Sequence, residues 1–184
     1  DLDGDGDSDF AYSTPNMVGW AKNNGSEGFV PQASVDSGLI DVSALDVEDY
    51  DGDGKNDLVY SDSSFVGIAV AKNQGSDSFI PQTIGSGISG VSDLEIADLD
   101  GDGQKDAVFA SQGSSLVGWM KNQGSDNFLP AEILSDGLTS VNQLEAADLD
   151  QDGDLDLVAS SSLHESSYWL ENDGSENFIP HSLI

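Results

Sequence analysis

One nine-residue acidic pattern occurs four times along the chain and constrains its fold more than any other feature. The copies begin at residues 1, 49, 98 and 148 and read DLDGDGDSD, DYDGDGKND, DLDGDGQKD and DLDQDGDLD. Their starts are therefore 48, 49 and 50 residues apart in a chain of 184 residues. A period of this length is typical of arrays in which each copy is one supersecondary unit that packs against its neighbours.

A second pattern keeps a constant phase with the first. It reads WAKNNGSEGFVP, VAKNQGSDSFIP, WMKNQGSDNFLP and WLENDGSENFIP and begins at residues 20, 70, 119 and 169. In every copy the Pro follows eight residues after the Asn that opens a turn, which is Asn23, Asn73, Asn122 or Asn172. Two patterns in fixed phase indicate one array of four units, with approximate limits 1–40, 41–89, 90–139 and 140–184.

Within each unit the residues predict four short antiparallel β-strands. An alternating segment such as SALDVEDY leads into the acidic loop, and an apolar segment such as DLVYS follows it. A third segment ends in the N-x-G-S turn, and a fourth carries Pro near its start. No stretch has convincing helical periodicity. We therefore predict an all-β fold of propeller-type blades with fifteen strands, because the first unit lacks the strand that would precede residue 1.

Composition excludes several classes of partner. The chain has 35 acidic residues against 5 Lys and no Arg, and its formal net charge is −30. Nucleic acids and anionic membranes need cationic contacts, so neither is expected as a partner. Disorder is also disfavoured, since 37% of the residues are hydrophobic and these include three Trp and seven Phe. Without Cys there is no disulfide framework, and no apolar run is long enough for direct membrane insertion.

The acidic loops follow the pattern D-x-D-x-D-G-x-x-D, which predicts a metal site. Oxygen ligands at alternate positions converge on one point when a loop curls round a hard cation, and Gly at position 6 permits the sharp turn. Calcium suits such a loop best, because it accepts six to eight oxygens in flexible geometry. We expect about four Ca²⁺ ions, one per repeat.

The predicted ligands occupy the same five positions in each loop. Positions 1, 3, 5 and 9 supply carboxylates: Asp1, Asp3, Asp5 and Asp9; Asp49, Asp51, Asp53 and Asp57; Asp98, Asp100, Asp102 and Asp106; Asp148, Asp150, Asp152 and Asp156. Position 7 is Asp7, Lys55, Gln104 or Asp154. That variety, which includes a Lys, predicts that position 7 binds through its backbone carbonyl.

Three alternative interpretations of the loops are disfavoured. EF-hand and dockerin-like loops both need an oxygen ligand at position 12. The residues found there are Tyr12, Tyr60, Phe109 and Ala159. Solvated acidic turns would not need a Gly at one fixed position in all four copies.

The loop between two short strands, followed by W-x-x-N-x-G-x-x-x-F, resembles the FG-GAP/VCBS repeat of integrin-α-type β-propellers. The resemblance covers essentially the whole chain and departs from the pattern at Gln151 in the fourth loop and Val70 in the second unit. It implies a calcium-stabilised, integrin-like propeller, usually extracellular and found in adhesion receptors, lectins and secreted enzymes. Such propellers commonly have about seven blades, so we expect a segment of a larger propeller or edges that neighbouring chains cover.

The remaining candidates favour structural roles. Trp20, Trp119 and Trp169 are equivalent, and we favour packing between blades over sugar-stacking platforms. His164 and His181 lie in the last unit without a catalytic arrangement, and we expect them at the surface. Asn24 opens the only glycosylation sequon, and we interpret it as a turn residue.

These features predict a non-catalytic module outside the cell or on its surface, in which calcium rigidifies each blade. Three roles remain open. An adhesion or binding module would take a protein or glycan ligand. A structural component of a surface filament would pair with neighbouring copies of itself. An accessory propeller of a secreted polysaccharide-active enzyme or lectin would have its partner domain elsewhere in a parent chain.

Overall fold

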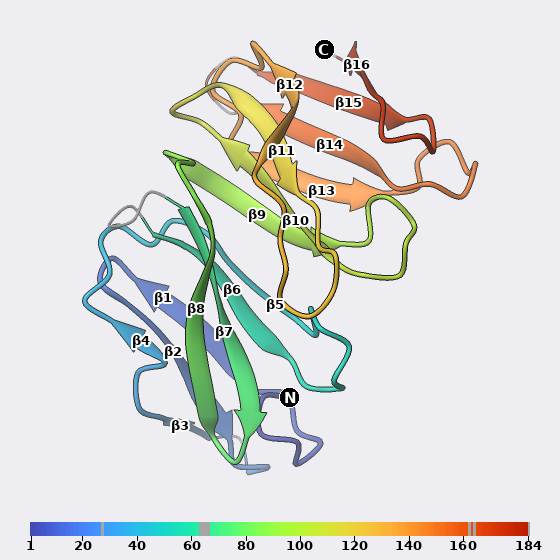
Figure 1. Ribbon diagram of the computed structural model, residues 1–184. Helices are drawn as coiled ribbons and strands as arrows, with labels where there is room; N and C mark the ends of the chain where they lie inside the picture. Colours follow the sequence, from blue (N-terminus) through green and yellow to red (C-terminus); the bar gives the residue numbers. More distant parts are fainter. Residues whose placement is uncertain (27, 63–66, 162, 164, 184) are drawn as a thin grey trace. The chain divides into compact units, whose positions relative to one another are not determined.

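The computed structural model describes residues 1–26, 28–62, 67–161, 163 and 165–183, and these form β-strands joined by loops (Figure 1). His164 lies outside the described residues. The described strands make four antiparallel sheets, which confirms the predicted all-β fold of propeller-like blades. Nowhere in the described ranges is there a helix long and apolar enough to cross a membrane. We call the sheets blades 1 to 4 in chain order.

The chain divides into two compact units, Asp1–Gly87 and Ile88–Ile184, each of which contains two blades. Blade 1 consists of β1 (Phe10–Thr14), β2 (Met17–Asn23), β3 (Phe29–Pro31) and β4 (Asp36–Ser37). Blade 2 consists of β5 (Leu45–Glu48), β6 (Asp57–Asp62), β7 (Gly67–Gly75) and β8 (Ser78–Ser86).

The second unit repeats the arrangement. Blade 3 consists of β9 (Val91–Ala97), β10 (Asp106–Ser111), β11 (Leu116–Met120) and β12 (Glu132–Asp136). Blade 4 consists of β13 (Gln143–Ala147), β14 (Asp156–Ser161), β15 (Ser166–Asn172) and β16 (Phe178–Ser182). In blades 2, 3 and 4 each strand pairs with the next strand along the chain, so that the acidic loop joins the first and second strands.

The described strands number sixteen rather than the predicted fifteen, because the outer strand of blade 1 is interrupted. Both β3 and β4 pair with β2, and in the register Ala21 faces Pro31 whereas Val18 faces Asp36. Pro31 and Asp36 are five positions apart, whereas their partners on β2 are only three positions apart. The two extra residues of the outer strand interrupt its pairing with β2. The corresponding strands β8 and β12 contain a smaller register shift and remain continuous.

Each blade pairs one aromatic residue with one small residue across the two strands that follow its acidic loop. The pairs are Tyr12 with Gly19, Tyr60 with Ala69, Phe109 with Gly118, and Ala159 with Tyr168. A Cβ atom added at Gly118 would lie 2.7 Å from the ring of Phe109, so the small residue leaves the space that the ring fills. In blade 4 the order is reversed, with the aromatic residue on the third strand.

The Trp residues of blades 1 and 3 join neighbouring blades within their units. Trp20 is buried and meets the ring of Phe79 of blade 2 edge-on, with 6.1 Å between ring centroids. Trp119 is also buried and contacts Phe178 of blade 4 at 6.5 Å. Trp169 differs, since it is only half-buried and stacks on His181 of its own blade at 4.8 Å. The first two side chains therefore belong to the apolar core.

Replacing Trp119 by Ala tests this packing role. The substitution removes a buried indole and its contact with blade 4, so we expect the free energy of unfolding to fall by about 3–5 kcal/mol. Trp169→Ala should cost less, because that indole is only partly buried. Urea unfolding followed by far-UV circular dichroism measures both variants. Equal losses would contradict the assignment of Trp119, but not Trp169, to the core between blades.

Candidate metal centres and blade junctions

The ninth residue of each loop braces the blade from inside. In blade 2, Asp57 Oδ1 accepts a hydrogen bond from the backbone N–H of Asn73 at 2.7 Å, and its Oδ2 accepts one from the N–H of Tyr50 at 3.4 Å. The same two bonds occur at Asp9, Asp106 and Asp156. One carboxylate thus ties the entry of the loop to the end of the third strand in every blade.

The first, third and fifth residues wind the loop itself. In the first loop Asp1 accepts hydrogen bonds from the N–H groups of Gly4 at 2.7 Å and Gly6 at 2.9 Å. Asp3 and Asp5 each accept one from the residue two positions later. The Gly at position 6 has φ between 84° and 103° in all four loops, which explains why only Gly is found there.

Position 4 needs the same left-handed backbone, and the fourth loop fills it with a residue that has a side chain. Gln151 has φ 67°, whereas the other three loops place Gly at this position with φ between 72° and 81°. An L-residue in this region costs roughly 1–2 kcal/mol. The departure noted in the sequence therefore strains the fourth loop without altering any predicted ligand.

The winding brings predicted ligands together in every loop. Oxygen atoms of three carboxylates lie within 4.8 Å of one another in four groups: Asp1, Asp3 and Asp5; Asp49, Asp51 and Asp53; Asp98, Asp100 and Asp106; Asp148, Asp150 and Asp152. Positions 1 and 3 occur in all four groups, whereas position 9 joins them only in the third. The full five-position ligand sets remain predictions.

The side chains at position 7 lie against the turn that follows the third strand. A Cβ atom added at Gly25 would lie 2.9 Å from Asp7 Oδ2, and one added at Gly124 would lie 3.3 Å from the side-chain oxygen of Gln104. The Gly of the N-x-G-S turn provides the space for this contact. In the second loop the Lys55 ammonium group also pairs with Asp53 at 2.6 Å, and binding of metal through the backbone carbonyl of position 7 remains a prediction.

The donor set fits a hard divalent cation. Asp98 Oδ1 is buried and has no hydrogen-bond partner, although it belongs to the third carboxylate group. A buried carboxylate oxygen without a partner carries a desolvation cost that a coordinated cation would offset. All side-chain donors in these groups are carboxylate oxygens, which are ligands that Ca²⁺ prefers.

Lysine side chains reach three of the four groups, and sequence reasoning missed them. Lys22 forms ion pairs with Asp3 and Asp5, the latter at 3.1 Å. The equivalent lysines of blades 2 and 3 pair with the third residue of their loops. The available signal was the Lys that immediately precedes the turn Asn in these three repeats.

The electrostatic environment differs between positions. Burial raises the pKa of Asp57 and of Asp106 to about 7, even though both accept backbone hydrogen bonds. The hydrogen bond from Lys55 lowers the pKa of Asp53. In the fourth loop, desolvation and the repulsion from Asp152 and Asp156 raise the pKa of Asp150. The loops therefore hold more negative charge than their own hydrogen bonds neutralise.

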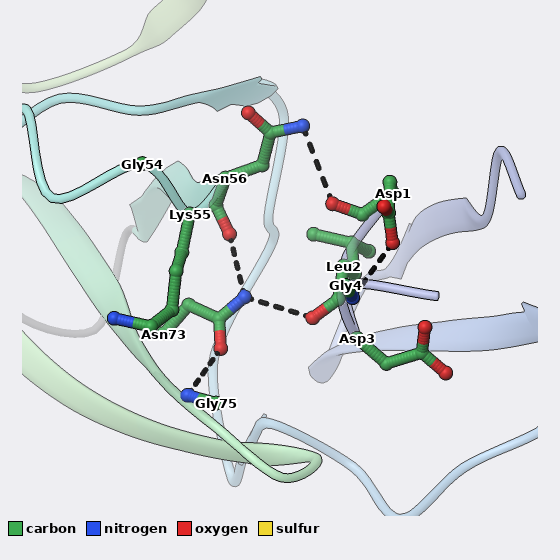
Figure 2. Close-up of a pocket in the computed structure, with 9 residues that line it drawn as sticks. All are labelled: Asp1, Leu2, Asp3, Gly4, Gly54, Lys55, Asn56, Asn73 and Gly75. Carbon is green, nitrogen blue, oxygen red and sulfur yellow. Dashed lines mark hydrogen bonds between the residues drawn. The ribbon is translucent and has the colours of Figure 1, made fainter. Parts of the chain in front are cut away.

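The turn Asn of blades 2 and 4 connects the two blades of its unit, as Figure 2 shows for Asn73. Asn73 Nδ2 donates to the carbonyls of Leu2 at 2.8 Å and Asn56 at 3.0 Å, and its Oδ1 accepts from Gly75 N–H. Leu2 belongs to the loop of blade 1, so this amide links that loop to blade 2. In the second unit Asn172 bonds in the same way to the carbonyl of Leu99.

Beside this link lies a cavity of about 290 Å³ between the first two acidic loops (Figure 2). Asp1, Asp3, Lys55 and Asn56 are among its lining residues.

The sequon residue Asn24 lies in the turn of blade 1, where its side-chain oxygen accepts hydrogen bonds from the N–H groups of Ser26 and Gly28. This agrees with its interpretation as a turn residue.

A second cavity of about 280 Å³ lies where blades 1 and 2 meet. Its polar lining includes Asp36, Tyr60, Asp62, Gln82 and Thr83. The Tyr60 hydroxyl donates to Asp36 Oδ2 at 2.5 Å, and Asp62 Oδ1 accepts from a backbone N–H of the preceding blade at 2.8 Å. Both acidic side chains are therefore held in place before any ligand enters.

Comparison with known proteins identifies the family of the repeats and structures with a similar fold. The FG-GAP-like repeat family matches residues 1–60, 49–109 and 98–159. No curated protein sequence matches the chain. A structure of an Agrocybe aegerita lectin, which recognises non-reducing terminal N-acetylglucosamine, is similar with a TM-score of 0.68 and 22% identity over 97% of this chain and 50% of the lectin.

An auxiliary nutrient binding protein from Bacteroides ovatus ATCC 8483 is also similar, with a TM-score of 0.53 and 8% identity. The alignment covers 98% of this chain and 55% of that protein. The chain thus spans about half the length of both structures. At these identities the likeness concerns the fold.

Substitutions at Asp156 and Asp152 distinguish the structural role of the ninth loop residue, which we call the brace, from metal binding. Asp156→Ala leaves two backbone N–H groups without their acceptor, so we expect a loss of about 2 kcal/mol or more even in chelator. Asp152→Ala removes an exposed carboxylate and should change stability by no more than about 0.5 kcal/mol in chelator. In millimolar Ca²⁺ the same variant should lose much of the stabilisation that calcium provides. Urea unfolding with and without Ca²⁺ measures both, and a calcium-only effect of Asp156→Ala would refute the brace.

The raised pKa values predict opposite pH dependences with and without metal. In chelator, folded Asp57 and Asp106 bind protons more tightly than the unfolded chain does, so stability should rise as pH falls from 8 to 5. In saturating Ca²⁺ stability should fall over the same range, since protons compete with the metal for carboxylates. Thermal melts at several pH values test this. Parallel slopes in the two conditions would contradict it.

Proposed function

Because the chain belongs to the FG-GAP-like repeat family, we propose that it is an extracellular or cell-surface, calcium-organised propeller module that binds carbohydrate without catalysis. The observation that carries the proposal is the cavity between blades 1 and 2. In this proposal the acidic loops have a structural role, and the cavity is the binding site.

The cavity has the chemistry of a site for a neutral, hydroxyl-rich ligand. Carboxylate oxygens of Asp36 and Asp62 accept hydrogen bonds, and Gln82 and Thr83 both donate and accept them. Leu39, Ala69 and Pro81 add apolar surface. None of the described lining residues is basic, which disfavours a phosphate or carboxylate ligand. A volume of about 280 Å³ is near the lower limit of small-ligand sites, roughly 300 Å³, and suits one sugar ring.

The similarity to the lectin supports the same ligand class. The lectin from Agrocybe aegerita recognises a terminal N-acetylglucosamine, and the Bacteroides ovatus protein is an auxiliary nutrient binding protein. Neither is described as an enzyme, which supports a binding role. We therefore expect a terminal sugar rather than the interior of a polysaccharide chain.

The calcium affinity expected of these loops supports the extracellular assignment. A loop of this kind has an expected dissociation constant on the order of 10⁻⁴–10⁻³ M, as in extracellular modules. Millimolar calcium outside the cell would fill such sites, whereas cytosolic calcium would not. By holding the loops, the ions would keep the blades at the spacing that forms the cavity.

A second candidate, association with another protein or another copy of the chain, rests on one exposed patch. Phe10, Phe29 and Val30 of blade 1 are each about half exposed, and the two Phe rings meet at 6.3 Å. Exposed aromatic residues that cluster are typical of protein contacts. Sedimentation in millimolar Ca²⁺ distinguishes this role, since only the second candidate requires self-association or a protein partner.

A glycan array in millimolar Ca²⁺ tests the carbohydrate proposal. We expect binding to glycans that end in a neutral or N-acetylated sugar. Gln82→Ala should weaken it about tenfold through lost hydrogen bonds. Gln32→Ala is the matched control, because Gln32 occupies the same position after the Pro in blade 1 and does not line the cavity. Failure to bind any glycan, or equal effects of both variants, would overturn the proposal.

A further inference from the structure

All five lysines of the chain lie in, or face, the first three acidic loops. Lys22, Lys72 and Lys121 immediately precede the turn Asn of repeats 1 to 3, while Lys55 and Lys105 lie inside the second and third loops. There is no Arg, and the sequence has no Lys after residue 121. The fourth loop is thus the only one without a basic residue in either position.

In the first three blades the strand lysine reaches the third residue of its loop. Lys22 pairs with Asp3, Lys72 with Asp51 and Lys121 with Asp100. The three carboxylates are largely buried, with side-chain exposures of 4%, 13% and 2%. Each belongs to a carboxylate group in which calcium is expected. The ammonium group is therefore a tethered cation at the edge of the metal site.

The fourth blade places an acid at the same strand position. Glu171 precedes Asn172 as Lys22 precedes Asn23, and its side chain lies 2.7 Å from His181 Nε2. Counting side-chain charges of the nine loop residues and this strand residue gives −4, −2, −2 and −6 for blades 1 to 4. Ligand charge is one of the two properties that tune calcium affinity in such loops.

We infer that the four calcium sites are graded in affinity. The fourth loop binds calcium first and most tightly, whereas in the first three loops the lysines compete with the ion for the carboxylates. This inference rests on the calcium part of the proposed function and is independent of the carbohydrate part. The ion pairs with lysine neutralise part of the carboxylate charge in the first three loops. The sequence gives the fourth loop no lysine at either position, so we expect calcium to stabilise this loop most.

Two opposite charge changes test the grading by isothermal titration with Ca²⁺. Glu171→Lys brings an ammonium group to the fourth loop and should weaken its tight site on the order of tenfold. Lys72→Met keeps the aliphatic stem, removes the charge and should strengthen the second site by a similar factor. Misfolding would not raise the affinity for calcium, so a stronger second site in Lys72→Met can be attributed to the removed charge.

Glu165→Lys is the matched control, because it makes the same charge change in the same repeat at an exposed residue outside the loop. It should leave the tight site within about twofold through screening. Hydrogen exchange at one equivalent of Ca²⁺ locates the first ion, and residues 148–156 should gain protection before the other three loops.

Four equal sites, first protection in another loop, or equal effects of Glu165→Lys and Glu171→Lys would overturn the grading alone. An absence of calcium binding at every loop would overturn the calcium part of the proposed function as well. A glycan result in either direction leaves both tests unchanged.

Discussion

The carboxylate at the ninth loop position is the contact on which the rest of each blade depends. Its two oxygens accept backbone hydrogen bonds from the loop entry and from the end of the third strand, as at Asp57. The second bond fixes the turn Asn, whose amide in blades 2 and 4 also reaches the neighbouring blade. In blades 2 and 4 a single buried carboxylate thus supports loop closure, the position of the third strand and, through the turn Asn, the contact with the neighbouring blade.

Electrostatics opposes this arrangement and explains the lysines. Three carboxylates gather in each loop within 4.8 Å, and burial adds a desolvation cost at positions such as Asp106. The chain has few cations to relieve the repulsion, and it uses them at the loops of blades 1 to 3. A bound divalent ion would supply further positive charge to oxygen ligands at this spacing. The charge that opposes folding is therefore the same charge that would attract a cation to the proposed sites.

Local patterns predicted most of the fold, because the repeat period, the alternation of apolar residues and the Gly at position 6 each act over a few residues. The predicted ligands at positions 1 and 3 meet in every loop. The brace at Asp57 was not predicted, since it joins groups that are brought together only when the third strand folds back. The lysine contacts were missed for the same reason. The break between β3 and β4 depends on two extra residues, whose effect appears only in the paired register.

The reversed aromatic pair of blade 4 has a consequence for how such an array is able to evolve. Exchanging whole repeats keeps each ring opposite its small partner. A genetic crossover inside a repeat does not: joining the second strand of blade 2 to the third strand of blade 4 would set Tyr60 against Tyr168. The reciprocal product would set Ala159 against Ala69 and leave a void. A crossover between these two copies would therefore disturb packing if it fell within the hairpin, whereas one at a blade boundary would preserve both pairs.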